Sequence, residues 1–152
     1  MIHIKKKIVV TSLVADPIHR GHIEVLKKSK EQGDFLIVLL DSNDKTVKKK
    51  GYCLMPIEDR KAIIESLDFV DWVIPINVSV AEALELLKPD CFCKGGDRTL
   101  ENLPLEEIQT CMRNNIEIIC GLGDKIQSSS ELVKKCCETI NILNGVQNGK
   151  EQ

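Results

Sequence analysis

The chain has 152 residues, of which 43% are hydrophobic and 29% are charged, and its formal net charge is −2. This length fits one domain with a substantial core, and the charge excludes the strongly basic class of nucleic-acid binders. No apolar run reaches membrane-spanning length. Three lysines at residues 5–7 lead directly into an apolar run rather than into a signal-peptide pattern. We therefore expect a cytoplasmic protein that binds neither nucleic acid nor membrane.

Hydrophobic patterning predicts strands that alternate with helices along the chain. The run at residues 34–40 is apolar on both faces, which is typical of a central parallel strand covered by helices. These elements predict one domain over residues 1–143, built as a doubly wound parallel α/β sheet, and a polar tail at 144–152. Strands are expected at residues 4–14, 34–40, 71–76, 91–93 and 116–120. Helices are expected at residues 21–32, 56–66, 80–87, 103–115 and 131–143.

Residues 41–51 interrupt this pattern because they are polar and basic and show no clear apolar face. A solvated loop is the simplest interpretation. The segment also follows the carboxyl end of a parallel strand, where α/β folds bind ligands. The functional interpretation is therefore a mobile loop whose Lys48 and Lys50 close over a triphosphate. In an extended segment Lys49 would point the other way and matter less.

Seven cysteines are many for a chain of this length. Two pairs lie close in sequence, but neither has the Cys-x-x-Cys spacing of a zinc or redox site. Cys91 and Cys93 alternate along an expected strand and should face the same way. We interpret the cysteines as small buried hydrophobic side chains that a cytosol keeps reduced.

The segment Asp16-Pro17-Ile18-His19-Arg20-Gly21-His22 connects the first expected strand to the first expected helix. At a spacing of three, His19 and His22 share one face of the first helical turn. Free backbone N–H groups and the positive end of the helix dipole make such a turn a phosphate site. Chance, a satisfied buried histidine and half of a zinc site are the alternatives, and no nearby ligand completes a zinc site.

This segment resembles the His-x-Gly-His signature of the cytidylyltransferase-like nucleotidyltransferases. That group includes glycerol-phosphate and phosphoethanolamine cytidylyltransferases, the adenylyltransferase part of ADP-heptose synthase, and archaeal FAD synthase. The resemblance covers residues 4–135 and implies a Rossmann-like sheet of five strands with helices on both faces and the nucleotide across its middle. The further similar segments, in order, are Gln32-Gly33-Asp34, Lys50-Gly51, Glu58-Asp59-Arg60, Val70-Asp71, Lys88-Pro89-Asp90, Lys94-Gly95-Gly96-Asp97 and Ser128-Ser129-Ser130.

The resemblance implies nucleotidyl transfer, in which a phosphate oxygen of a phosphorylated acceptor attacks the α-phosphorus of a nucleoside triphosphate and pyrophosphate leaves. His19, His22 and Lys50 are the catalytic candidates. Mg²⁺ or another divalent cation would be held mainly by the triphosphate, with no protein ligand assigned. The expected nucleotide-binding residues are Val14, Ala15, Asp16, Gly21, Lys48, Arg60, Gly95, Gly96, Asp97, Ser128, Ser129 and Ser130.

Some of these residues have two interpretations. Asp16 either orients the site or its metal, or stabilises the turn as an Asx cap. Arg60 either lies near phosphate or pairs with a nearby acid at the surface. One serine is enough for a helix N-cap, so the run at residues 128–130 favours a phosphate site.

We expect an active nucleotidyltransferase that joins a nucleotide to a phosphorylated polyol or sugar, with CTP slightly favoured over ATP. The segment Lys94-Gly95-Gly96-Asp97 is closest to the heptose-phosphate branch, which uses ATP, whereas CTP is common in the group. Its glycines would let the backbone approach a ligand, and Asp97 would meet acceptor or ribose hydroxyls.

Two other functions stay open. Leu13 stands where relatives usually have glycine, which motivates a nucleotide-binding protein of the same fold with impaired catalysis. A metal-binding module that uses His19, His22 and cysteines is a further alternative. The sequence does not choose the base or the acceptor, and it leaves open whether the chain forms a homodimer.

Overall fold

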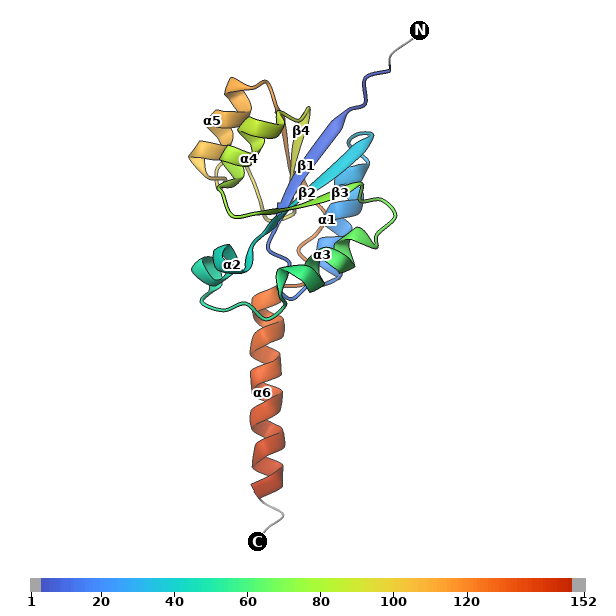
Figure 1. Ribbon diagram of the computed structural model, residues 1–152. Coiled ribbons are helices and arrows are strands. Elements are labelled where there is room, and N and C mark those ends of the chain that lie inside the picture. The colour runs from blue at the N-terminus through green and yellow to red at the C-terminus, as the bar shows by residue number, and fades with distance from the viewer. Residues whose placement is uncertain (1–3, 149–152) are drawn as a thin grey trace.

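The computed structural model describes residues 4–148 and is built around one parallel sheet of five strands (Figure 1). The strand order is β3-β2-β1-β4-β5, and each neighbouring pair is parallel. This topology confirms the predicted doubly wound, Rossmann-like sheet. The strands are β1 (Ile8–Leu13), β2 (Phe35–Asp41), β3 (Trp72–Ile76), β4 (Cys91–Gly95) and β5 (Glu117–Leu122).

Helices cover both faces of the sheet, as the two buried clusters demonstrate. Val9 and Val10 are neighbours in β1, and both are 0% exposed because their side chains enter opposite faces. The Val9 side packs against Leu26 and Ile64, which come from α1 (Arg20–Lys30) and α3 (Ile57–Glu65). The Val10 side packs against α4 (Val80–Leu87) and α5 (Leu105–Arg113), through Leu84 and Cys111 among others.

The topology brings the two most distinctive sequence segments to one edge of the sheet. β1 and β4 are neighbours, but the chain leaves β1 toward β2 and leaves β4 toward β5. The connections that follow these strands therefore diverge, and a doubly wound sheet has its ligand crevice at such a point. The histidine segment follows β1, and the Gly-Gly-Asp segment begins at the last residue of β4.

The basic stretch expected to be a mobile loop is instead a helix, α2 (Asn43–Lys50). Ser42 Oγ accepts a hydrogen bond from the Lys45 N–H at 3.2 Å and caps the helix start. Gly51, at φ 85°, closes its end in the left-handed conformation. These local caps define a helix that has hardly any apolar face. The extended-segment argument about alternating lysines is therefore wrong, because side chains on a helix follow a period of 3.6 residues.

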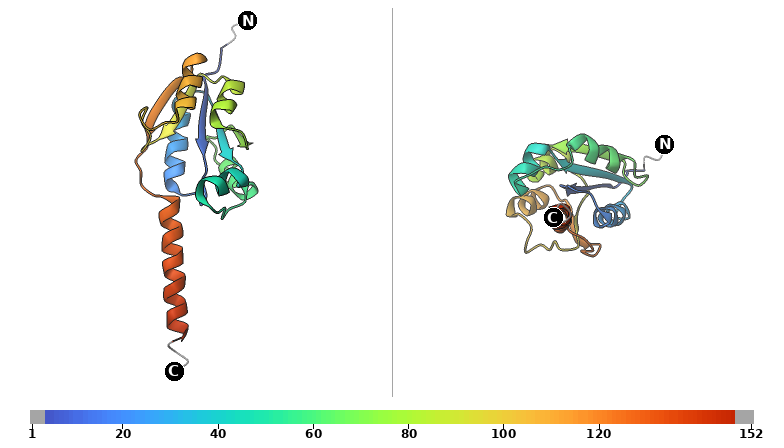
Figure 2. Two further views of the ribbon diagram at one scale, coloured as in Figure 1. Left: turned by 90° about the vertical axis from the view of Figure 1, so that its left-hand side faces the viewer. Right: turned by 90° about the horizontal axis from the view of Figure 1, so that it is seen from below.

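The last helix, α6 (Ser129–Asn148), is longer than expected and continues through most of the predicted polar tail. Residues 149–152 of that tail lie outside the described residues. Figures 1 and 2 show α6 projecting away from the sheet, and the right-hand view of Figure 2 looks along it. Residues 134–145 are all exposed. Within residues 4–148, no helix combines the length and the apolar character needed to cross a membrane.

The seven cysteines differ in burial, and two of them, Cys53 and Cys120, are partly exposed. Cys91, Cys93 and Cys111 are buried free thiols, which confirms their interpretation as small hydrophobic side chains. The Sγ atoms of Cys91 and Cys93 lie 3.6 Å apart, so the two side chains do face the same way. Cys136 and Cys137 are exposed on α6, where the expectation of burial was wrong.

Candidate functional site

A cavity of about 570 Å³ lies at the carboxyl ends of β1, β2 and β4. Its wall combines the segment after β1, the start of α1, the ends of α2 and β4, the start of α5 and the segment that enters α6. These are the positions that a doubly wound sheet gathers at its ligand-binding edge. The wall contains the following predicted site residues: Val14, Ala15, His19, Gly21, His22, Lys50, Gly95, Gly96, Asp97, Ser128, Ser129 and Ser130.

The two histidines cap the start of α1 with their own side chains. His19 Nδ1 accepts a hydrogen bond from the Gly21 N–H at 3.1 Å, and His22 Nδ1 accepts one from the His19 N–H at 3.2 Å. Because Nδ1 is an acceptor in both rings, each neutral imidazole carries its proton on Nε2. The ring centroids lie 3.8 Å apart. The start of α1 thus presents a pair of adjacent imidazole N–H donors in the cavity wall.

The surroundings of the histidines keep them uncharged. Burial lowers the pKa of His22 to about 3, and repulsion by His19 in its protonated form and by the Lys50 ammonium acts in the same direction. Burial, followed by the charge of Lys50, also lowers the pKa of His19. Both rings are therefore neutral near pH 7, which is the state that the Nδ1 caps require.

The lysines of α2 differ in where they point. Lys50 Nζ donates to the Asp16 carbonyl oxygen at 2.7 Å, and burial lowers its pKa, partly opposed by the charge of Asp16. Lys49 also lines the cavity and donates to the Asp41 carboxylate at 2.5 Å. Lys48 is exposed and, among the described residues, is not part of the cavity wall. Of the two lysines expected to bind the triphosphate, Lys50 lies in the cavity wall and Lys48 does not, whereas Lys49 lies there without having been expected.

Asp16 and Arg60 hold the backbone around the cavity rather than facing into it. Both are 0% exposed. The Asp16 carboxylate accepts from the backbone N–H groups of Leu54 and Met55 at 2.8 and 2.7 Å, so it is neither a local Asx cap nor free for a metal. Arg60 donates to the backbone carbonyls of Val14, Asp41 and Met55, each at 2.8 Å. Within the described structure neither lines the cavity, so the phosphate and surface-acid interpretations of Arg60 are both corrected.

The glycines after β4 allow two stretches of chain to pack closely. A Cβ atom on Gly96 would lie 1.8 Å from the Gly123 carbonyl oxygen, and one on Gly95 would lie 3.1 Å from a Val25 methyl group. Contacts within the protein therefore require glycine at Gly96 and favour it at Gly95, and both residues also line the cavity, so their approach to a ligand stays a prediction. Asp97 is more than half exposed at the cavity wall, with its carboxylate 3.8 Å from Lys125 Nζ.

The serine run connects the start of α6 to the histidine segment. Ser129 Oγ donates to the Pro17 carbonyl oxygen at 2.8 Å, and Ser128 Oγ accepts from the Glu131 N–H at 3.5 Å. All three serines line the cavity. The run therefore contains both an N-cap and the free N–H groups of a helix start beside the imidazoles.

Sequence reasoning missed a polar part of the wall at the ends of the strands. It consists of Ser12, Asp41, Lys49, Lys94 and Glu107, which we call the strand-end cluster. Lys94 Nζ donates to Ser12 Oγ at 2.9 Å and lies 4.0 Å from Glu107 Oε2. Burial lowers the pKa of Lys94, with Glu107 opposing the shift. Asp41 and Lys94 could have been found as charged residues at strand ends, whereas Glu107 carries no such signal.

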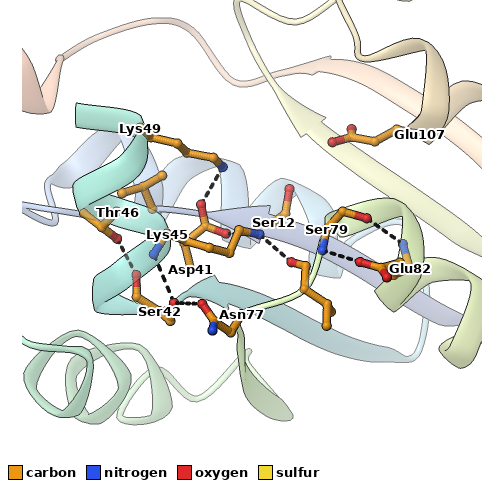
Figure 3. Close-up of polar contacts among 12 residues, drawn as sticks. Ser12, Asp41, Ser42, Lys45, Thr46, Lys49, Asn77, Ser79, Glu82 and Glu107 are labelled. Carbon is orange, nitrogen blue, oxygen red and sulfur yellow. Dashed lines mark hydrogen bonds and ion pairs between the residues drawn. The ribbon is translucent and has the colours of Figure 1, made fainter. Parts of the chain in front are cut away.

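Figure 3 shows the Asp41 part of this cluster beside α2. The Asp41 carboxylate is held by Lys49, and Lys45 Nζ lies 2.9 Å from its Oδ1 as an ion pair that is not aligned as a hydrogen bond. Among residues 4–148, no three His, Cys, Asp or Glu side chains are grouped as a metal site. The described structure thus gives no support to the metal-binding alternative.

Comparison with known proteins gives results that agree with this geometry. A family model described as cytidylyltransferase-like matches residues 14–135. The chain is 30% identical over 149 residues to the bifunctional protein HldE of Shigella sonnei, and 32% identical over 146 residues to that of Cronobacter sakazakii. These alignments cover 96% and 93% of this chain but only 29% and 28% of the relatives. The chain thus spans less than a third of their length.

A solved structure shares the fold. The lipopolysaccharide core biosynthesis protein from Thermoplasma volcanium superposes with a TM-score of 0.68 at 24% identity. The match covers 79% of this chain and 99% of that chain. At this identity the similarity establishes the architecture alone.

Proposed function

Because this chain belongs to the cytidylyltransferase-like family, we propose that it is a nucleotidyltransferase that joins a nucleoside monophosphate to a phosphorylated sugar or polyol. The observation that carries the proposal is the pair of neutral imidazoles at the start of α1, with both Nδ1 atoms occupied and both Nε2–H groups left as donors. Lys50 and the start of α6 line the same cavity. Such donors and a cation at two helix starts suit the phosphate groups of a triphosphate.

The proposed reaction needs charge stabilisation more than a protein nucleophile. A phosphate oxygen of the acceptor would attack the α-phosphorus, a new P–O bond would form, and the bond to the pyrophosphate oxygen would break. His19 and His22 would donate to phosphate oxygens as negative charge builds on them, and Lys50 would neutralise the leaving pyrophosphate. The serines before and within the first turn of α6 would hold the triphosphate in position.

Mg²⁺ is part of the proposal as an ion held by the substrate. The groups beside the imidazoles are ammonium and hydroxyl donors, and the Asp16 carboxylate is occupied by backbone N–H groups. This set fits an ion bound by phosphate oxygens and water rather than by protein carboxylates. When bound, the ion would neutralise charge shared between phosphate groups.

The HldE relatives, aligned over more than nine-tenths of the chain, favour ATP and a sugar phosphate over the CTP preferred from sequence. A pyrophosphate-release screen of four nucleoside triphosphates with Mg²⁺ tests the proposal. The acceptors are phosphorylated sugars, phosphorylated polyols, ethanolamine phosphate and riboflavin phosphate. We expect release with one pair, ATP and a sugar phosphate. Nucleotide binding without release for any pair would instead support the catalytically impaired alternative.

A further inference from the structure

Glu107 is a buried carboxylate that the proposed chemistry does not use. It lies in the first turn of α5, is 8% exposed and lines the cavity. Its Oε2 has no hydrogen-bond partner among the described residues, because Lys94 Nζ is 4.0 Å away and donates to Ser12 instead. Figure 3 shows the carboxylate pointing from α5 toward the strand ends. A buried carboxylate that lacks a donor is costly, and this carboxylate lines the cavity, so a hydrogen-bond donor on a ligand would stabilise it.

The strand-end cluster around Glu107 is chemically different from the histidine end of the cavity. It contains the carboxylates of Asp41 and Glu107, which are 1% and 8% exposed. Between and beside them lie the ammonium groups of Lys49 and Lys94 and the hydroxyl of Ser12. At the histidine end, by contrast, the imidazole, ammonium and hydroxyl groups of His19, Lys50 and the serine run can each donate a hydrogen bond.

This mixture of charges selects among the ligands that the cavity could hold. A triphosphate or pyrophosphate placed against Glu107 and Asp41 would be repelled by both carboxylates. An ammonium group on the ligand would be repelled by the ammonium group of Lys94, which already lies 4.0 Å from Glu107 Oε2. A hydroxyl group meets neither obstacle, because it is an uncharged donor for the carboxylate oxygen. The two lysines can attract a single phosphate group on the same molecule.

We propose that the strand-end cluster is the acceptor subsite, and that the Glu107 carboxylate accepts a hydrogen bond from a hydroxyl group of a sugar or polyol phosphate. This inference rests on the proposed function and assigns the acceptor class of that reaction. A site that hydrogen-bonds a hydroxyl group with a buried charge discriminates strongly against an analogue that lacks it, because the charge is then left unpaired. Glu107 is therefore a specificity-determining residue for the acceptor.

The test compares Glu107→Gln with Glu106→Gln, a matched control on the same helix whose side chain is exposed. Pyrophosphate release is measured with a sugar phosphate and with its monodeoxy analogues. Glu107→Gln should raise the KM for the acceptor by about tenfold or more, as expected for a charged hydrogen bond, and leave that for the triphosphate unchanged. One monodeoxy analogue should have a higher KM than the unmodified sugar phosphate with the wild type. With Glu107→Gln the same analogue should have a KM no higher than that of the unmodified sugar phosphate. The control should behave as the wild type.

Other values of the two KM constants, or no pyrophosphate release at all, lead to different conclusions. A raised KM for the triphosphate alone would place Glu107 at the nucleotide and overturn the inference, as would a preference for ethanolamine phosphate. If the wild type releases pyrophosphate with no pair, the proposed function fails, and the subsite is tested by thermal shift with the sugar and polyol phosphates. Stabilisation of the wild type but not of Glu107→Gln would then support the subsite, and equal or absent shifts in both proteins would overturn it.

Discussion

Replacing Arg60 with methionine should destabilise the fold without acting directly on the reaction. The guanidinium is fully buried and donates to the carbonyls of Val14, Asp41 and Met55, each at 2.8 Å, and to Asn43 Oδ1 at 3.0 Å. Methionine fills much of the space but leaves these acceptors without a donor. Each buried acceptor left without a donor costs about 1–3 kcal/mol, so the loss of several together should cost about 3–5 kcal/mol. That is a large part of a domain's total stability of about 5–15 kcal/mol.

Urea unfolding followed by circular dichroism measures this loss. With a slope of about 2 kcal/mol per molar urea, the midpoint should fall by about 2 M while the slope stays the same. Lys61→Met is the matched control on α3, because Lys61 is partly exposed and pairs only with Glu65 in an i, i+4 contact. That pair contributes at most about 0.5 kcal/mol.

The opposite pattern would refute this account of Arg60. If Arg60→Met keeps the urea midpoint of the wild type and raises the KM for the triphosphate tenfold, the guanidinium contacts phosphate. The buried hydrogen bonds would then contribute little to stability, contrary to the argument from the structure.

Three further predictions concern the histidines and the lysines. His22→Ala should slow pyrophosphate release by about 100-fold or more, roughly 3 kcal/mol, because a donor to the developing charge is lost. A rate equal to that of the wild type would show that the His22 side chain does not take part in the reaction. The pKa of His22 is about 3 in the folded protein, below an unfolded value of about 6.5, so the unfolded chain takes up the proton first and stability falls with falling pH between these values. From pH 7 to pH 5 the wild type should lose about 2 kcal/mol more than His22→Asn in urea unfolding, and parallel pH profiles would contradict this. Lys50→Ala should raise the KM for the triphosphate by about tenfold. Lys48→Ala, at an exposed position, should leave that KM unchanged. Equal effects of the two substitutions would contradict the different orientations of these side chains on α2.

The fold was predictable because its signals are local and repeated. Val9, Val10 and residues 36–40 form uninterrupted apolar runs, and both faces of their strands are in fact buried. The histidine segment was predictable for the same reason, since a strand, a tight turn and a helix follow within a few residues. His19 and His22 then need only the spacing of one helical turn to meet.

The parts that sequence reasoning missed depend on contacts between distant segments. The burial of Arg60 depends on carbonyl groups of Val14 and Asp41, which no local pattern connects to it. Glu107 looks like an ordinary acidic residue in a first helical turn, and only the packing of α5 turns it into the cavity. The helix α2 was missed for another reason: it has hardly any apolar stripe, and a serine and a glycine at its ends define it.

Because α6 is attached to the cavity at its first turn, a small tilt of the helix there produces a larger displacement of its far end. Its first turn lines the cavity and is fixed through Ser129 Oγ to the Pro17 carbonyl, while residues 134–145 are exposed. Twenty residues at 1.5 Å each give a rod about 30 Å long, so a tilt of about 5° at the cavity moves the far end by about 2–3 Å. Cys136 and Cys137 are exposed on this rod, whereas Cys91, Cys93 and Cys111 are buried. Cys136 and Cys137 lie about 11–12 Å from the start of α6, so the same tilt moves a thiol-reactive probe attached there by about 1 Å.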